Sequence, residues 1–160
     1  MKKTGFSSRL LLKELEKTGL FVFHGSPRLF KKLEPRQQMN YSPRAGKLVK
    51  DGKPAVCVTP FIKVAIFRAL IYRDWTNFGQ TNGKVFLRAS KEALNITRST
   101  KKKAYVYVFR KTDFRKHSPL ELRRSQPTAP LATIPVIVDD VPKGIQIIKN
   151  WQRFRTRLKK

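Results

Sequence analysis

The chain has 160 residues, and its 36 Lys and Arg against 10 Asp and Glu give a formal net charge of +26. Hydrophobic residues make up 40% and aromatic residues 11%, which is enough to bury a core and excludes a disordered polycation. Such an excess of positive charge destabilises a compact fold unless an anionic partner offsets it. The expected partner is nucleic acid, RNA or DNA, alone or within a ribonucleoprotein.

The cysteine count and the hydropathy of the sequence exclude further classes of protein. The single cysteine, Cys57, excludes an internal disulfide, and with only two histidines far apart we expect no metal site. No segment approaches the ~20 apolar residues that span a bilayer, and charges interrupt the short apolar run near the N-terminus. The sequence therefore predicts a soluble, cytoplasmic protein without a membrane partner.

The first third of the chain predicts a helix, a strand and a loop. Ser7 and Ser8 can cap a helix over "RLLLKELEK", which Gly19 would close. "LFVF" predicts a buried strand that ends at His24, and "RLFKKLEP" predicts a short helix or turn. Residues 36–53 are polar and rich in turn residues, which favours a long surface loop of functional importance.

The middle of the chain predicts a second strand followed by a helix. "AVCVTP" is strand-like and stops at Thr59, which we expect to cap a helix over residues 61–75. Apolar residues at spacings of three and four predict that one face of this helix packs in the core. These residues are Ile62, Ala65, Ile66, Ala69 and Leu70.

The remaining segments predict further strands and a basic tail. "GQTNG" predicts a turn, "KVFLRAS" and "AYVYVFR" predict strands, and "TRSTKKK" a cationic loop. "ATIPVIV" is also strand-like, and its Pro135 indicates either an edge strand or the first residues of a strand. Ile147, Trp151, Phe154 and Leu158 would share one face of a basic C-terminal helix. We therefore predict one α+β domain over residues 1–148 and a basic helix or tail over 149–160.

Three motifs in order resemble a known fold. A strand ends in His24-Gly25-Ser26, a second carries V-x-V-T-P over residues 56–60 before an Ala-containing helix, and Glu121 precedes "PTAPLATIPVIV". Over about residues 20–141 the chain resembles ADP-ribosyltransferases of the diphtheria toxin and poly(ADP-ribose) polymerase branch. It is also similar to small bacterial and phage domains with the same order of motifs. The resemblance implies a split antiparallel or mixed β-sheet core with short flanking helices.

The resemblance also implies an NAD site. In that family a histidine at the position of His24 holds a ribose hydroxyl of NAD, and backbone groups at Gly25 hold the nicotinamide amide. An imidazole can donate to or accept from a hydroxyl without adding charge, and a glycine lets the backbone approach a flat ligand. The alternative for His24 is a structural hydrogen bond at the end of the strand. The residues expected to bind NAD are His24, Gly25, Ser26, Cys57, Thr59 and Phe67.

Cys57 is the main departure from the family. It falls where the family has a tyrosine that stacks on nicotinamide, and a thiol offers no comparable surface. Phe61, Phe67 or Tyr72 could supply an aromatic wall instead, although core packing is the alternative for all three and is favoured for Phe67. A nucleophilic Cys57 would need a histidine nearby, and we expect a buried, inert thiol.

Glu121 and His24 are the candidate catalytic residues. In the family a glutamate at this position stabilises the positive charge that develops on the sugar as nicotinamide departs, and electrostatic stabilisation of this kind is usually the largest catalytic effect. The alternative is a surface ion pair of Glu121 with Lys116, Arg123 or Arg124. Arg124 stands where relatives tend to carry serine. We expect His117 to be a loop residue or a phosphate contact.

Two segments carry the densest positive charge, "STKKKAY" and "KNWQRFRTRLKK". We expect their cations to neutralise phosphates, with affinity but little sequence specificity. The predicted phosphate contacts are Lys101, Lys102, Lys103, Lys149, Arg153, Arg155, Arg157, Lys159 and Lys160.

Two functions remain open from the sequence. The first is an NAD-dependent ADP-ribosyltransferase that modifies nucleic acid or a protein bound to it, with residues 36–53 covering the site or selecting the acceptor. The second is a catalytically silent module of the same fold that binds RNA, such as ribosomal RNA, or DNA through its basic surface. His24 and Glu121 favour the first function, whereas the net charge and Cys57 favour the second.

Overall fold

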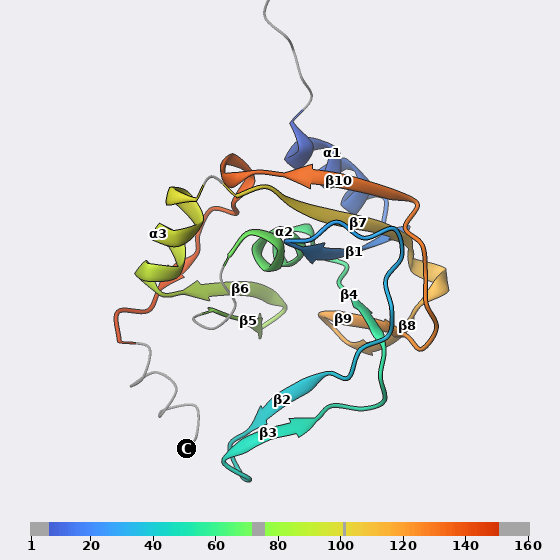
Figure 1. The fold of residues 1–160 in the computed structure, drawn as a ribbon, viewed down its shortest axis with the longest axis horizontal. Coiled ribbons are helices and arrows are strands. Elements are labelled where there is room, and N and C mark those ends of the chain that lie inside the picture. The colour runs from blue at the N-terminus through green and yellow to red at the C-terminus, as the bar shows by residue number, and fades with distance from the viewer. Residues whose placement is uncertain (1–6, 72–75, 101, 151–160) are drawn as a thin grey trace, which may run out of the picture.

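Two three-stranded antiparallel sheets frame the protein in the computed structural model, which describes residues 7–71, 76–100 and 102–150 (Figure 1). The first sheet has the order β1-β7-β10, with bounds Phe21–Ser26, Ala104–Arg110 and Ala132–Val136. The second has the order β4-β9-β8, with bounds Val56–Val58, Glu121–Arg124 and Arg115–Ser118. One backbone bridge, between Phe23 and Thr59, connects β1 to β4 and so joins the two sheets.

Helix α2 (Ile62–Leu70) lies at the centre of the core. Its predicted apolar stripe packs against β1, β7 and β10, as expected. The opposite side of the helix, including Val64 and Phe67, packs against a third sheet and α3 (Lys91–Ser99). That sheet has the order β11-β6-β5, with bounds Gln146–Ile147, Lys84–Ala89 and Thr76–Thr81. Because α2 is buried on nearly every side, it fixes the position of β1 relative to the rest of the fold.

The predicted capping of α1 (Ser8–Lys17) is confirmed, whereas that of α2 is wrong. Ser7 Oγ accepts a hydrogen bond from the Leu10 amide, and Gly19 has a φ of +68° just after the helix. The cap position of α2 is Phe61, which makes no side-chain capping bond, and the Thr59 hydroxyl two residues earlier accepts a hydrogen bond from the Phe61 amide at 3.2 Å. The amide of Ile62 instead donates to Glu16 Oε2 of α1 at 2.6 Å.

Several polar segments fold differently from the prediction. Residues 36–53 are not a loop, because they contain the hairpin of β2 (Met39–Ser42) and β3 (Lys47–Lys50), which projects from the body in Figure 1. Residues 28–35 form bends without a helix, with one bridge from Leu33 to Thr128. Strands β5, β8, β9 and β11 and helix α3 were not predicted. Two short 3₁₀ helices complete the description, at Lys111–Asp113 and Val138–Asp140.

The C-terminal prediction is corrected in part. Ile147 lies in β11, which pairs in parallel with β6, so it does not begin a helical face. The other three members of that face, Trp151, Phe154 and Leu158, lie outside the described residues. The α+β class and the edge position of Pro135 in β10 are confirmed. In the described ranges no helix is long and apolar enough to cross a bilayer.

Candidate functional site

The site lies where the two sheets separate. Phe23 and Thr59 exchange two backbone hydrogen bonds of 2.8 Å. In an antiparallel ladder such pairs recur at every second residue, so the next would join Gly25 and Cys57. The carbonyl of Cys57 instead accepts a hydrogen bond from His24 Nδ1 at 2.8 Å. The imidazole therefore replaces a bond of the ladder at the point where β1 and β4 diverge.

This hydrogen bond fixes the chemistry of the His24 ring. A carbonyl oxygen can only accept, so Nδ1 carries a proton, and in the neutral ring Nε2 is an acceptor. The structural role that the sequence left open for His24 is therefore present. His24 also lines the cavity that opens between the two sheets.

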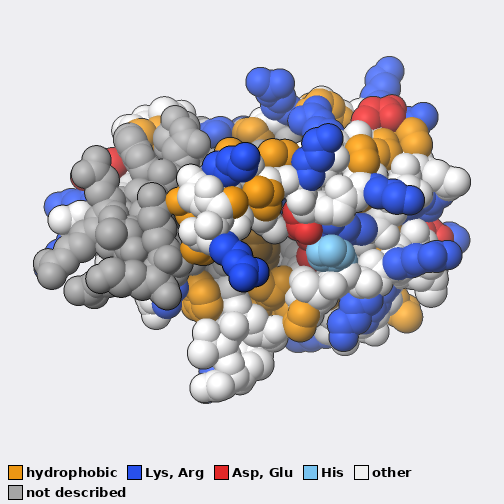
Figure 2. Space-filling view, turned by 90° about the horizontal axis from the view of Figure 1, so that it is seen from below, with side chains coloured by type: hydrophobic (Ala, Val, Ile, Leu, Met, Phe, Trp, Pro, Cys, Tyr) orange, Lys and Arg blue, Asp and Glu red, His pale blue; other side chains and the backbone are white. Residues whose placement is uncertain are grey.

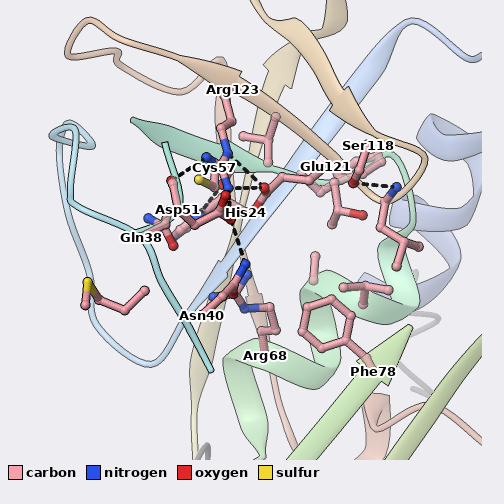
Figure 3. A pocket seen from close by; sticks show the side chains of 18 residues that line it. His24, Gln38, Asn40, Asp51, Cys57, Arg68, Phe78, Ser118, Glu121 and Arg123 are labelled. Carbon is pink, nitrogen blue, oxygen red and sulfur yellow. Dashed lines mark hydrogen bonds and ion pairs between the residues drawn. The ribbon is translucent and has the colours of Figure 1, made fainter. Parts of the chain in front are cut away.

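The opening is a cavity of about 300 Å³. Figure 3 shows the side chains that line it, which come from both sheets, the β2–β3 hairpin, α2 and β5. Its volume is at the lower end of the range for small-molecule sites, so it suits a nucleoside-sized group with further atoms at the mouth. The polar and aromatic residues in this lining are Phe23, His24, Gln38, Asn40, Asp51, Cys57, Thr59, Arg68, Phe78, Ser118, Glu121 and Arg123.

Glu121 lies in this cavity and is bound to Arg123. Oε2 of Glu121 lies 2.8 Å from Nε and 2.7 Å from Nη2 of Arg123. Nη2 also contacts Asp51 Oδ2 at 2.6 Å, and Nη1 donates to the Asp51 carbonyl at 2.8 Å. Burial disfavours a charged guanidinium, but the hydrogen bonds to Asp51 and Glu121 raise the pKa of Arg123 above its ordinary value. The ion pair expected as an alternative for Glu121 thus exists within the cavity.

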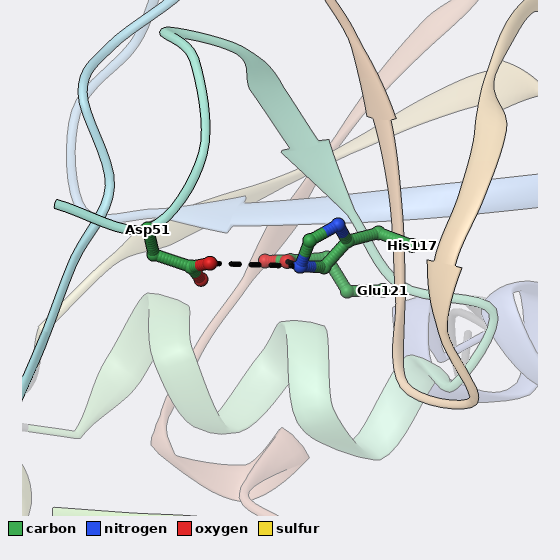
Figure 4. Close-up of side chains that lie close together, drawn as sticks. All are labelled: Asp51, His117 and Glu121. Carbon is green, nitrogen blue, oxygen red and sulfur yellow. Dashed lines mark ion pairs between the residues drawn. The ribbon is translucent and has the colours of Figure 1, made fainter. Parts of the chain in front are cut away.

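His117 completes this cluster at the rim. It lies on β8, and its Nε2 is 3.7 Å from Asp51 Oδ1 and 4.0 Å from Glu121 Oε2 (Figure 4). The ligand atoms of these three residues lie within 4.8 Å of one another, a spacing that a metal ion could use. Arg123 already holds both carboxylates, however, so the arrangement is an ion-pair network rather than a prepared metal site.

Cys57 lines the same cavity as the two candidate catalytic residues. Its carbonyl accepts a hydrogen bond from His24 Nδ1 at 2.8 Å, and its thiol donates to the Ala55 carbonyl at 4.0 Å. Burial, reinforced by the charge of Glu121, raises the pKa of the Cys57 thiol to about 12. The thiol is therefore protonated at neutral pH, which fits the predicted inert cysteine and not a nucleophile.

This protonation gives a direct prediction. Ellman's reagent at pH 8 should leave the native protein unlabelled and should titrate one thiol after denaturation, because Cys57 is the only cysteine. The raised pKa also means that the folded state loses stability as the pH rises from about 9 toward 12, where the unfolded chain ionises first. Native labelling at the rate of a free thiol would show that the cavity presents a thiolate.

The structure separates the other predicted NAD contacts into two groups. Gly25 and Thr59 line the cavity, whereas Ser26 and Phe67 do not. Ser26 is buried and its Oγ accepts a hydrogen bond from the Arg28 amide at 3.2 Å, so it shapes the following turn. Phe67 is 1% exposed and packs on the side of α2 that faces β6 and α3, which confirms its packing alternative.

The need for glycine at position 25 comes from packing as much as from any ligand. A Cβ added there would lie 1.8 Å from the carbonyl oxygen of Ala65 in α2. The absence of a side chain therefore lets the helix lie directly against β1. Close approach of a flat ligand, which the sequence suggested, would be a second reason for glycine at this position.

The aromatic side chain that the sequence analysis missed is Phe78. It lies on β5 and lines the cavity, and the guanidinium of Arg68 is 5.6 Å from its ring centre. Phe61 lines a different hollow between α1 and α2, and Tyr72 lies outside the described residues. The only sequence signal for Phe78 is its place before the "GQTNG" turn, where a hairpin strand would precede "KVFLRAS".

Most of the predicted phosphate contacts lie beyond the described part of the chain. Lys101 and residues 151–160 fall outside it, whereas Lys102, Lys103 and Lys149 are described, the last two as exposed. Figure 2 shows a face on which acidic and histidine side chains lie together in a hollow, with Lys and Arg side chains on several sides. An anionic ligand that approaches this face meets positive charge before it reaches the acids.

Comparison with known proteins adds no identification. No protein-family model matches the chain, and searches of curated proteins and of solved structures returned no match.

Proposed function

We propose that the protein is an NAD-dependent ADP-ribosyltransferase that modifies nucleic acid or a protein bound to it. One observation carries the proposal. His24 on β1, Cys57 on β4 and Glu121 on β9 line the same cavity, and His24 is hydrogen-bonded to the carbonyl of Cys57. This shared lining supports the three-strand site of His, Tyr and Glu that the sequence resemblance implies, with a thiol at the middle position.

The lining residues suit NAD as a substrate. When bound, NAD would supply the N-glycosidic bond whose cleavage releases nicotinamide and leaves ADP-ribose for the acceptor. His24 would hold a ribose hydroxyl through Nε2 while Nδ1 keeps its bond to Cys57. Phe78 would offer the aromatic surface that Cys57 lacks, and Arg68 a cation for the pyrophosphate.

Glu121 would act by electrostatics. Its carboxylate would stand beside the ribose carbon where positive charge develops, in a partly buried position where such an interaction is strong. Arg123 binds only Oε2 in the contacts above, and it holds the carboxylate in one orientation. The Arg123 guanidinium also reduces the net negative charge around Glu121. For catalysis, the bound substrate would therefore have to compete with Arg123 for the Glu121 carboxylate.

The experiment is transfer of label from NAD radiolabelled in the adenylate phosphate. The acceptors would be single-stranded RNA, single-stranded DNA and a basic protein, each incubated with the purified full chain. We expect label on at least one acceptor. If none is labelled and calorimetry detects no NAD binding at millimolar ligand, the proposal is wrong.

The second candidate is a silent module that binds nucleic acid by charge. The observation that favours it is the ion pair of Glu121 with Arg123, together with the protonated thiol at Cys57. In this case generic RNA should bind without NAD, and its affinity should fall steeply between low and moderate salt. Removal of residues 149–160 should weaken that binding, and unchanged affinity would place the footprint elsewhere.

A further inference from the structure

The outward charge of the β2–β3 hairpin is entirely positive. Residues 36–53 contain one acid, Asp51, whose carboxylate is turned inward to Arg123 and Asn40. The exposed cations of the hairpin and its flanks are Arg36, Arg44, Lys47, Lys50 and Lys53. The segment therefore presents a local excess of positive charge that an anionic polymer can neutralise.

One face of the hairpin is apolar and exposed. The register places Met39 opposite Lys50 and Tyr41 opposite Leu48, and residues at these alternating positions share a face. Met39 is 46%, Tyr41 43% and Leu48 60% exposed. An aromatic ring flanked by aliphatic side chains, with a lysine on the same face, is the combination that holds unpaired bases and their phosphates.

The same hairpin forms part of the cavity wall. Gln38, Met39 and Asn40 line the cavity together with Glu121 (Figure 3). Asn40 Nδ2 donates to Asp51 Oδ2 at 2.8 Å, which ties the hairpin to the Arg123 network. A strand laid along the hairpin toward its base therefore arrives at the mouth of the cavity.

We propose that the β2–β3 hairpin is the docking surface for a single-stranded nucleic acid and directs it to the cavity. A duplex fits less well, because its base faces are stacked internally and the apolar face would remain exposed to water. The role of this strand as the acceptor of ADP-ribose rests on the proposed function, but the binding itself does not.

The test measures binding without NAD. Fluorescein-labelled oligo(dT) and oligo(U) of 12 nucleotides, and a duplex of the same length, are titrated with the full chain by fluorescence anisotropy at several salt concentrations. Lys47→Gln with Lys50→Gln should weaken single-strand binding about tenfold at 0.1 M salt. The slope of log affinity against log salt should fall by about 1.4, since each phosphate contact contributes about 0.7. Tyr41→Ala should weaken binding at least about fivefold.

The matched control removes the same charge away from the hairpin. Lys91→Gln with Lys111→Gln changes two exposed lysines on α3 and on the 3₁₀ helix after β7, and should weaken binding less than about threefold. Circular dichroism checks that each variant is folded. Equal losses in the hairpin and control variants, or unchanged affinity of Tyr41→Ala, would overturn the proposal.

Two further readouts separate the alternatives. A duplex that binds as tightly as the single strands would show phosphate contact alone and overturn the proposal. Self-association in sedimentation velocity that Tyr41→Ala abolishes would assign the apolar face to a second copy of the chain.

If the NAD proposal fails while the hairpin variants lose oligonucleotide binding as expected, the docking surface stands without the enzyme. The difference between oligo(dT) and oligo(U) indicates DNA or RNA.

Discussion

Glu121→Gln is expected to reduce transfer of ADP-ribose by about 10²–10³-fold and to leave NAD affinity nearly unchanged. The amide keeps the shape and a hydrogen-bonding oxygen but removes the negative charge opposite the developing positive charge on ribose. Because that charge exists mainly in the transition state, its loss lowers kcat more than it raises KM. Label transfer at saturating NAD, together with calorimetric titration of NAD, measures the two quantities separately.

The fold should tolerate this substitution, which makes the result interpretable. Arg123 keeps its two contacts to Asp51 when Glu121 is neutral. Glu92→Gln is the matched control, because Glu92 is an exposed acid in the first turn of α3. Full transfer activity in Glu121→Gln would remove this residue from catalysis, and an equal loss of activity in Glu92→Gln would show that the effect is not local.

Arg123→Met is expected to lower the free energy of unfolding by about 2–3 kcal/mol. Removal of one partner of a fully buried ion pair costs about 3–5 kcal/mol, and the figure is discounted here because the carboxylates are partly exposed. The Arg123 side chain is 11% exposed, against 25% for Asp51 and 23% for Glu121. Without the guanidinium, the carboxylates of Asp51 and Glu121 lose the cation that both contact, and the more distant His117 is left near the two of them. Urea denaturation followed by circular dichroism measures the loss.

The control for this prediction is the next residue in the strand. Arg124→Met removes the same charge from β9, but alternation places its side chain on the opposite face from Arg123. Its effect should be below about 1 kcal/mol. Adding Glu121→Gln to Arg123→Met should recover part of the lost stability by removing the repulsion from Asp51. A change below about 0.5 kcal/mol for Arg123→Met, within the usual range for surface substitutions, would show that solvent replaces the guanidinium without cost.

The sequence predicted those parts of the fold that carry a local pattern. Strands β1, β4, β7 and β10 are dense in β-branched and aromatic residues, and α2 has an unambiguous apolar stripe. The hairpin β2–β3 and strand β5 are mainly polar, so only their pairing partners define them as strands. Phe78 was missed for this reason, since its place in the cavity follows from β5.

Only some members of the candidate site, and few of its internal hydrogen bonds, were predicted from the sequence. His24, Cys57, Thr59 and Glu121 were named from short motifs, and all of them line the cavity. Asp51 comes from the hairpin segment that the sequence presented as a loop, so its link to Arg123 could not be foreseen. The bond from His24 to the Cys57 carbonyl likewise depends on where two strands part, which no local pattern encodes.

The most direct test of the shared NAD site is the imidazole resonance of His24. The chain has two histidines, so ring-labelled protein gives two sets of imidazole signals, and a His117→Gln variant assigns them. On titration with NAD to millimolar concentration, the His24 signals should shift and saturate. The Glu121→Gln variant should saturate at a similar concentration. His24 signals that stay unchanged throughout the titration would contradict the placement of NAD between β1 and β9.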